Sequence, residues 1–196
     1  MKRRYDQSSA GTHRDMRPLR LRQGSPQSGS PHNGAVFFDR DGCLNEDIGF
    51  LHERAKFRWL PGAADAVKLA NRTGLRAFVV TNQSGIARGY YATEDVHLIH
   101  RHMSEELAKQ GAWIDAFRHC PHHPEYGERV HCTCRKPSSG MITDLMKAWH
   151  VDPGRAFMVG DRASDVQAAE GAGIRGIQVE PGNVLAIIRR EIARMG

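Results

Sequence analysis

Acidic residues follow the first strongly apolar run of the chain. Ala35–Phe38 are all apolar, and Asp39, Asp41, Glu46 and Asp47 come within the next nine positions. A short apolar run of this kind predicts a buried strand. The sequence therefore brings several carboxylates to the end of a core element, although solvated turn residues are an alternative interpretation of each one.

Polar and acidic residues follow two further apolar runs in the same way. Val80 leads into Thr81-Asn82-Gln83-Ser84, and Val159 leads into Gly160-Asp161, with Asp165 four residues later. In an open parallel sheet, ligands bind outside the carboxyl ends of the strands, so we expect these segments to meet in one crevice. Turn or capping roles explain a single Asp better than they explain three such strand ends.

Clustered carboxylates repel one another, and some stay protonated unless a cation joins them. Mg²⁺ bound by one or two carboxylates together with substrate phosphate oxygens is the usual arrangement. The same crevice would gather phosphate-binding groups, namely the hydroxyls of Thr81 and Ser84, backbone N–H groups near Gly85 and the basic pair Arg135-Lys136. Metal, carboxylates and anion-binding groups together indicate phosphoryl transfer with an Asp as covalent nucleophile.

The four cysteines are Cys43, Cys120, Cys132 and Cys134. Disulfides are rare in cytosolic proteins, and three thiols within fifteen residues are typical of metal ligands. The last three, with one imidazole, would complete a closed tetrahedral zinc site of the structural type. Reduced thiols in a surface loop are the alternative, and several histidines compete for the fourth position: His119, His122, His123 and His131.

Short apolar runs alternate with longer amphipathic runs from residue 35 onward. The predicted strands are Ala35–Phe38, Arg76–Val80, Ala116–His119, Ala156–Val159 and Gly176–Val179. The predicted helices are Ala63–Arg72, Thr93–Gln110, Met141–His150, Ser164–Ala172 and Val184–Met195. This alternation indicates an α/β fold, a Rossmann-like parallel sheet with helices on both faces.

The longest predicted helix, Thr93–Gln110, leads to two local expectations. Thr93 is a suitable N-cap residue. His97, His100 and His102 do not share one helix face well, and surface positions are expected for them.

The formal net charge of +6 is concentrated near the N-terminus. Residues 1–34 carry seven Lys/Arg and two acids, whereas the rest of the chain carries 21 basic and 20 acidic residues. Residues 1–33 are rich in Ser, Gly, Gln, Pro and Arg, which indicates a disordered basic tail before a single domain over residues 34–196. A nucleic-acid-binding arm, an organelle transit peptide and a true start at or after Met16 are the alternatives.

No apolar run approaches the roughly 20 residues of a membrane-spanning helix, and the N-terminus lacks the apolar region of a secretory signal. We therefore expect a cytoplasmic protein with no membrane partner, and we expect a monomer. The near-neutral domain has no basic patch with interleaved aromatic residues, which argues against a nucleic-acid partner.

Four segments resemble, in order and spacing, the motifs of the haloacid dehalogenase superfamily. DRDGCLN, residues 39–45, resembles the first motif, Thr81 the second, Lys136 the third, and GDRASD, residues 160–165, the fourth. The sequence departs from the family pattern at Cys43, where Thr or Val is usual. No long insertion follows the first or second motif, so the resemblance implies a member with no large cap domain.

The resemblance implies a role for each matching residue. Asp39 would be the nucleophile that becomes an aspartyl phosphate, and Asp41 the general acid and then the general base. Thr81 and Lys136 would neutralise charge on the phosphoryl oxygens. Mg²⁺ would be held by the side chains of Asp39 and Asp161 and the backbone carbonyl of Asp41, with Asp165 in support.

The cysteine loop CPHHPE…CTCRKP is similar to the zinc loop of one branch of this superfamily, the D,D-heptose 1,7-bisphosphate phosphatases. This similarity implies that Cys120, His122, Cys132 and Cys134 are the zinc ligands. The zinc would then act as a staple that fixes the following Arg135 and Lys136 at the active site.

The string TNQSGIARGYY, residues 81–91, resembles the same branch. The implied reaction is removal of the C7 phosphate from a small-molecule sugar bisphosphate, D-glycero-D-manno-heptose 1,7-bisphosphate. Arg135 suits the second phosphate because its planar guanidinium binds such oxygens bidentately. The implied substrate contacts are Asp47, Ile48, Gly49, Phe50, Thr81, Asn82, Gln83, Ser84, Arg135 and Lys136.

Three other functions compete with this interpretation. Histidinol-phosphate phosphatases share the fold and the nucleophile and often the zinc loop. A nucleic-acid end-processing phosphatase would use the same two aspartates with the basic tail as an arm. A non-enzymatic zinc-binding adaptor would need the cysteine loop but not Asp39, Asp41, Lys136 and Asp161 together.

Overall fold

A computed structural model describes residues 33–128 and 131–195. Five parallel strands form one sheet in the order β3-β2-β1-β4-β5. The strands are β1 (Ala35–Phe38), β2 (Arg76–Asn82), β3 (Ala116–Cys120), β4 (Ala156–Gly160) and β5 (Arg175–Gln178). The helices are α1 (Ala63–Arg72), α2 (Thr93–Lys109), α3 (Gly140–Trp149), α4 (Ala163–Gly171) and α5 (Val184–Met195), with short 3-10 turns η1 (Arg54–Lys56) and η2 (Pro153–Arg155).

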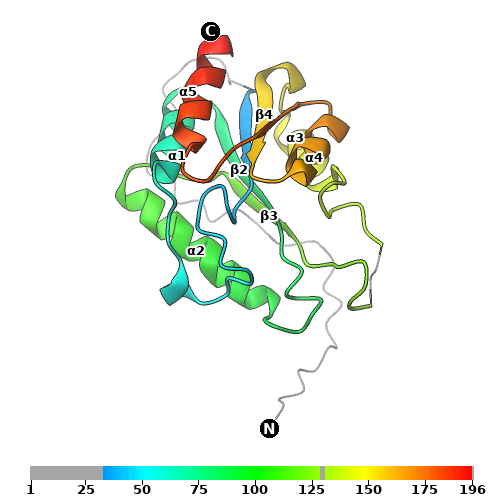
Figure 1. Ribbon diagram of the computed structural model, residues 1–196. Coiled ribbons are helices and arrows are strands. Elements are labelled where there is room, and N and C mark those ends of the chain that lie inside the picture. The colour runs from blue at the N-terminus through cyan, green and yellow to red at the C-terminus, as the bar shows by residue number, and fades with distance from the viewer. Residues whose placement is uncertain (1–32, 129–130, 196) are drawn as a thin grey trace.

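The central strand β1 is buried on both faces because helices cover both sides of the sheet. Val36 and Phe38 pack into the core beneath α1, α2 and α5. Ala35 and Phe37, which alternate with them, pack into a second core beneath α3 and α4. Figure 1 shows these two helical layers on opposite sides of the strands. The predicted fold class is confirmed.

The observed elements lie close to the predicted ones. The bounds of β1, α1 and α5 coincide with the prediction, and every other strand and α-helix differs by one or two residues at one or both ends. The short turns η1 and η2 were not predicted. The expected N-cap at Thr93 is wrong, since Ala92 occupies that position. The carboxylate of Asp95 accepts a hydrogen bond from the Ala92 backbone N–H at 2.8 Å, so an acid in the first turn satisfies this donor.

The expected surface position of His100 is also wrong. This side chain is 5% exposed, and its ring stacks on Phe117 with centroids 4.4 Å apart. His100 lies four residues after Val96 and three before Met103, which are both buried, so it occupies the apolar face of α2.

Segments 39–62 and 83–92, which follow β1 and β2, contain no helix other than η1, so neither holds a cap domain. Across the ranges 33–128 and 131–195, no helix has the length and apolarity needed to cross a membrane. The tail predicted over residues 1–33 lies outside the described residues except for Asn33.

Candidate active site

The three strand ends singled out by the sequence meet at one edge of the sheet. β1 pairs with both β2 and β4, with Phe38 opposite Val79 on one side and Val159 on the other. The backbone N–H of Asp39 continues this pairing with a 2.9 Å hydrogen bond to the Val159 carbonyl. Parallel register therefore brings the residues after β1, β2 and β4 to the same crevice.

Asp39, Lys136 and Asp165 form a buried ion triad at this edge. The Lys136 ammonium lies 2.7 Å from Oδ1 of Asp39 and 2.7 Å from Oδ1 of Asp165. It also donates to the Val80 carbonyl at 2.9 Å. Asp39 Oδ1 accepts a second hydrogen bond, at 2.7 Å, from the Arg40 backbone N–H. One cation thus pairs with two carboxylates that are both largely buried.

The pKa of Asp39 is raised to about 7, chiefly because the carboxyl is buried, and the nearby Lys136 only partly offsets this effect. Burial alone would lower the pKa of Lys136, but the charges of Asp39 and Asp165 outweigh it and raise that pKa. Burial also raises the pKa of Asp161. The acidic cluster therefore holds less negative charge at neutral pH than its composition implies.

The oxygens of Asp39, Asp161 and Asp165 fit a hard divalent cation. One carboxylate oxygen from each residue lies within 4.8 Å of the others. The Oδ1 atom of Asp161 is buried and has no hydrogen-bond partner among the described residues. Oxygen ligands of this kind suit Mg²⁺. A dication would both coordinate the unpaired Oδ1 atom of Asp161 and relieve the repulsion between the carboxylates.

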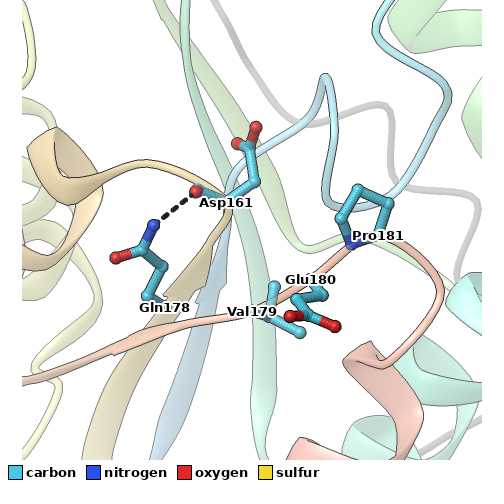
Figure 2. Close-up of a pocket in the computed structure, with 5 residues that line it drawn as sticks. All are labelled: Asp161, Gln178, Val179, Glu180 and Pro181. Atoms are coloured by element: carbon cyan, nitrogen blue, oxygen red, sulfur yellow. Dashed lines mark hydrogen bonds between the residues drawn. The ribbon is translucent and has the colours of Figure 1, made fainter.

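Two local features hold Asp161 toward this cluster. Gly42 has φ +84°, and a Cβ there would lie 2.5 Å from Oδ2 of Asp161, so only glycine lets the turn after β1 approach this closely. Figure 2 shows the Gln178 side chain bonded to the Asp161 backbone carbonyl, with the Asp161 carboxylate pointing away from Gln178. This hydrogen bond is 2.9 Å long. Asp161 and Gln178 border an open pocket of about 420 Å³, which is also lined by Val179, Glu180 and Pro181.

Because cation binding requires ionised carboxylates, we predict that the Mg²⁺ affinity of this site rises with pH. Below pH 7 the Asp39 carboxyl, with its pKa raised to about 7, is mostly protonated and must lose its proton on binding. The affinity should therefore fall by up to about tenfold for each pH unit below 7 and level off above it. Calorimetric titration between pH 5.5 and 8.5 in two buffers, which also counts released protons, tests this; equal affinity at pH 6 and 8 would contradict it.

The Asp41 carboxylate does not join the metal cluster but lies in a hydrogen-bond network of its own. It accepts bonds from the side chains of Arg40, Asn45 and Gln83 at 2.8 to 3.1 Å. Of these donors, the sequence analysis named only Gln83. Arg40 was missed because a fully buried arginine is rare, although its place between two aspartates was a signal.

Residues at the predicted substrate-binding positions after β2 divide into two groups. Asn82 bonds reciprocally with the Lys136 backbone, at 3.0 and 3.1 Å, and so fixes the main chain that carries the lysine. The Gln83 side chain is 3% exposed and bonds to Asp41, Thr81 and Tyr91. Both side chains bond within the protein, whereas Ser84 has a partly exposed position.

The loop over residues 47–50 lies at the mouth of the crevice. Ile48 is 47% and Phe50 is 41% exposed, and the Phe50 ring contacts Tyr90 edge-on with centroids 4.7 Å apart. Asp47 accepts a bond from the Gly49 backbone N–H at 2.9 Å and pairs with Arg162 at 2.7 Å. Arg162, which sequence reasoning also missed, thus ties this loop to the segment of Asp161.

The predicted zinc ligands come together at the end of β3. Cys120 Sγ lies 3.6 Å from His122 Nδ1, 3.7 Å from Cys132 Sγ and 3.2 Å from Cys134 Sγ, and His122 Nδ1 lies 3.3 Å from Cys134 Sγ. Zn–S bonds of about 2.3 Å place tetrahedral ligands about 3.8 Å apart, close to these separations. All four cysteines of the chain are free thiols. The pKa of Cys134 is lowered to about 5, chiefly by its hydrogen bond with Cys120.

Removing one ligand of this cluster should release zinc and loosen the loop. We predict that Cys132→Ser binds less than about a fifth of the zinc of the wild type and melts about 5 °C lower or more, because metal binding and local folding are coupled. Metal analysis and thermal melting of the purified proteins measure both effects. Cys43→Ser is the matched control, since Cys43 lies outside the cluster. A zinc-free Cys132 variant that melts with the wild type would refute a structural role for the metal.

Comparisons with known proteins extend these observations. Residues 133–187 match the HAD-hydrolase-like family model. The chain is 44% identical over 169 residues to D-glycero-beta-D-manno-heptose-1,7-bisphosphate 7-phosphatase of Rhodopseudomonas palustris, covering 85% of this chain and 94% of that protein. It is 39% identical over 166 residues to D-glycero-alpha-D-manno-heptose-1,7-bisphosphate 7-phosphatase of Burkholderia mallei, covering 83% and 84%.

A solved structure gives a similar result. D,D-heptose 1,7-bisphosphate phosphatase from B. bronchiseptica, crystallised with magnesium and phosphate, matches with a TM-score of 0.70 and 34% identity. The match covers 82% of this chain and 86% of that one. The similarity therefore extends over most of the chain rather than over one motif.

Proposed function

Since the chain belongs to the D,D-heptose 1,7-bisphosphate phosphatase branch of the haloacid dehalogenase superfamily, we propose that it removes the C7 phosphate of D-glycero-D-manno-heptose 1,7-bisphosphate. The chain is thereby a phosphoric monoester hydrolase. The observation that carries the proposal is the buried triad of Asp39, Lys136 and Asp165, with Asp161 beside it. A structural site would gain little from burying two carboxylates around one lysine with a third carboxylate beside them.

Asp39 is the nucleophile in this proposal. The contacts from Lys136 and the Arg40 backbone both fall on Oδ1, which supports Oδ2 as the attacking oxygen. As the new O–P bond forms, the bond between phosphorus and the sugar O7 breaks. The O7 atom takes a proton from Asp41, and the phosphoryl group stays on Asp39 as an aspartyl phosphate.

The second half of the reaction returns Asp39 to its starting state. A water molecule attacks phosphorus while Asp41 takes its proton, and the acyl phosphate bond breaks to give inorganic phosphate and the Asp39 carboxylate. Asp41 ends with the proton that it lost in the first half, so the cycle balances. Asp39 is buried and paired with Lys136, whereas Asp41 pairs with Arg40 in a separate network. This separation supports different roles for the two carboxylates.

Lys136 and Thr81 would stabilise the transferring group. The Lys136 ammonium, fixed between two carboxylates, would neutralise charge on the phosphoryl oxygens. Thr81 Oγ1 accepts a hydrogen bond from Gln83 at 2.9 Å, which leaves its hydroxyl proton available for a phosphoryl oxygen. Mg²⁺, held by Asp39, Asp161 and the Asp41 backbone carbonyl with Asp165 in support, would add positive charge at the same group when bound.

Arg135 would bind the second phosphate of the substrate. Its guanidinium donates to the His122 carbonyl at 3.1 Å and remains partly exposed, so the cysteine loop orients it while leaving donors for a ligand. Asp47, Ile48, Gly49 and Phe50 would contact the sugar from the mouth of the crevice. Gln83 would contact the substrate only through its backbone carbonyl, because its side chain and its backbone N–H are hydrogen-bonded within the protein.

Phosphate release by the purified protein with Mg²⁺ tests the proposed substrate. The panel contains both anomers of the heptose bisphosphate, because the relatives include one named for each, together with histidinol phosphate and a 3′-phosphorylated oligonucleotide. We expect kcat/KM for one heptose anomer to exceed that for the other two substrates by about 100-fold or more. Activity on histidinol phosphate alone would retain the phosphatase chemistry and overturn the proposed substrate.

A further inference from the structure

The Asp41 carboxylate receives two hydrogen bonds on each of its oxygens. Oδ1 accepts from Arg40 Nε at 3.1 Å and from Asn45 Nδ2 at 2.9 Å. Oδ2 accepts from Arg40 Nη2 and from Gln83 Nε2, both at 2.8 Å. Arg40 therefore bridges both oxygens, and the four donors together fix the rotation of the carboxylate. Because these donors fill its acceptor sites, the Asn45 amide, which also donates to the Glu46 carbonyl, would give up its bond to Oδ1 whenever Asp41 carries a proton.

Arg40 is an unusual donor because its side chain is wholly buried. In the part of the chain that the structure describes, Asp41 is the only carboxylate that pairs with it. The nearby His100 carries no negative charge that could pair with Arg40. Burial and the Arg40 charge hold the pKa of His100 well below its usual value. A buried cation is costly unless it is well paired, so the geometry of Asp41 and the position of Arg40 depend on each other.

Gln83 extends this arrangement to the loop that follows β2. Its Oε1 atom accepts a hydrogen bond from the Tyr91 hydroxyl at 2.8 Å, which sets the amide with its Nε2 toward Asp41. Tyr91 is itself packed tightly, since a Cβ on Gly85 would clash with its ring and His52 stacks on it at 5.2 Å. The orientation of Asp41 is thus set by side chains from two separate segments.

We propose that Arg40, supported by Gln83 and Tyr91, is a positioning residue that holds the Asp41 carboxylate where it transfers protons during phosphoryl transfer. This inference rests on the proposed function, in which Asp41 serves both half-reactions. Proton transfer needs a heavy-atom distance of about 2.6 to 3.2 Å, and an error of about 1 Å costs about 100-fold in rate. Arg40 contacts Asp41 rather than the reacting atoms, so it acts through the orientation of that carboxylate.

With 4-nitrophenyl phosphate as the substrate, the two half-reactions distinguish a loss of Asp41 positioning from general damage to the active site. In the first, Asp39 attacks phosphorus and the 4-nitrophenolate leaves as an anion, so no proton from Asp41 is needed. In the second, water attacks the aspartyl phosphate and gives its proton to Asp41. A loss of positioning should therefore slow the second step and spare the first.

Arg40→Gln is the direct test, with quenched-flow measurement of nitrophenolate release and of phosphorylated protein. We expect the first-turnover rate to stay within about threefold of the wild type, while phosphoenzyme hydrolysis slows about 100-fold and phosphorylated protein accumulates. In Arg40→Lys, phosphoenzyme hydrolysis should proceed at a rate between those of the wild type and Arg40→Gln, because one ammonium cannot bridge both oxygens of Asp41. Equal slowing of both steps, or no slowing of hydrolysis, would overturn the positioning role.

A milder variant keeps the test decisive if Arg40→Gln does not fold. Tyr91→Phe removes only the hydroxyl that orients Gln83 and should slow hydrolysis about threefold to tenfold, whereas Tyr90→Phe, at an exposed neighbour, should not change it. Identical hydrolysis rates for these two variants would overturn the role of the network.

Failure of the proposed substrate is a separate outcome. If the wild type is inert toward heptose 1,7-bisphosphate, the proposed function is overturned. The measurements with 4-nitrophenyl phosphate would still test the positioning role of Arg40. Absence of phosphorylated protein from both the wild type and Arg40→Gln would overturn the aspartyl-phosphate mechanism and, with it, the role of Arg40.

Discussion

Asp39→Asn should lower turnover of the preferred substrate by at least about 10⁴-fold, because an amide cannot form the aspartyl phosphate. The fold should survive, since asparagine has nearly the same shape and Lys136 keeps its 2.7 Å ion pair with Asp165. Removing one buried carboxylate also relieves repulsion within the acidic cluster. Steady-state phosphate release, far-ultraviolet circular dichroism and thermal melting measure these effects.

The matched control is Asp65→Asn, the same chemical change at an exposed carboxylate on α1. This variant should retain wild-type turnover. Turnover by Asp39→Asn within tenfold of the wild type would remove Asp39 from the role of nucleophile. A collapsed fold in that variant would instead assign the residue a structural role.

Lys136→Met should have the second largest effect, with kcat lowered about 10³-fold and a melting temperature lowered by roughly 5 to 10 °C. The substitution removes the only cation that pairs with Asp39 and Asp165 in the described residues, so two buried carboxylates lose their charge partner. The rate should fall because charge on the transferring phosphoryl oxygens is no longer neutralised. Enzyme kinetics and melting with and without Mg²⁺ measure both effects.

Lys147→Met, at an exposed position on α3, is the control for loss of a lysine charge. It should melt within about 2 °C of the wild type. Added Mg²⁺ should recover part of the lost melting temperature in Lys136→Met, since a dication would again neutralise the acids. A variant at position 136 with unchanged stability and kcat would contradict the importance of the triad.

The sequence was informative wherever periodicity or motif spacing determines structure. Strands such as β1 are continuous apolar runs, and helices such as α1 have a regular apolar face, so the predicted bounds agree with the structure to within two residues. The meeting of the ends of β1, β2 and β4, which lead to Asp39, Thr81 and Asp161, followed from the parallel sheet alone, because the carboxyl ends of its strands share an edge.

The hydrogen-bond partners of each side chain could not be predicted from periodicity or motif spacing. Arginine is mostly exposed, so composition gave no reason to bury Arg40, whereas the helical spacing of His100 from Val96 and Met103 was a signal that sequence reasoning missed. The amide groups of Asn82 and Gln83 suit either a ligand or the protein, and only the folded arrangement shows them bonded to Lys136 and Asp41. Such choices depend on three-dimensional neighbours that are distant in the sequence.

Phosphorus-31 nuclear magnetic resonance of heptose 1,7-bisphosphate with the purified protein and Mg²⁺ tests the central claim most directly, because it distinguishes the two phosphates of one molecule. The proposed function predicts that the C7 signal disappears as inorganic phosphate appears, while the C1 signal remains and a heptose 1-phosphate accumulates. Loss of the C1 phosphate, or an unchanged spectrum under conditions in which the protein is folded and metal-loaded, would contradict it.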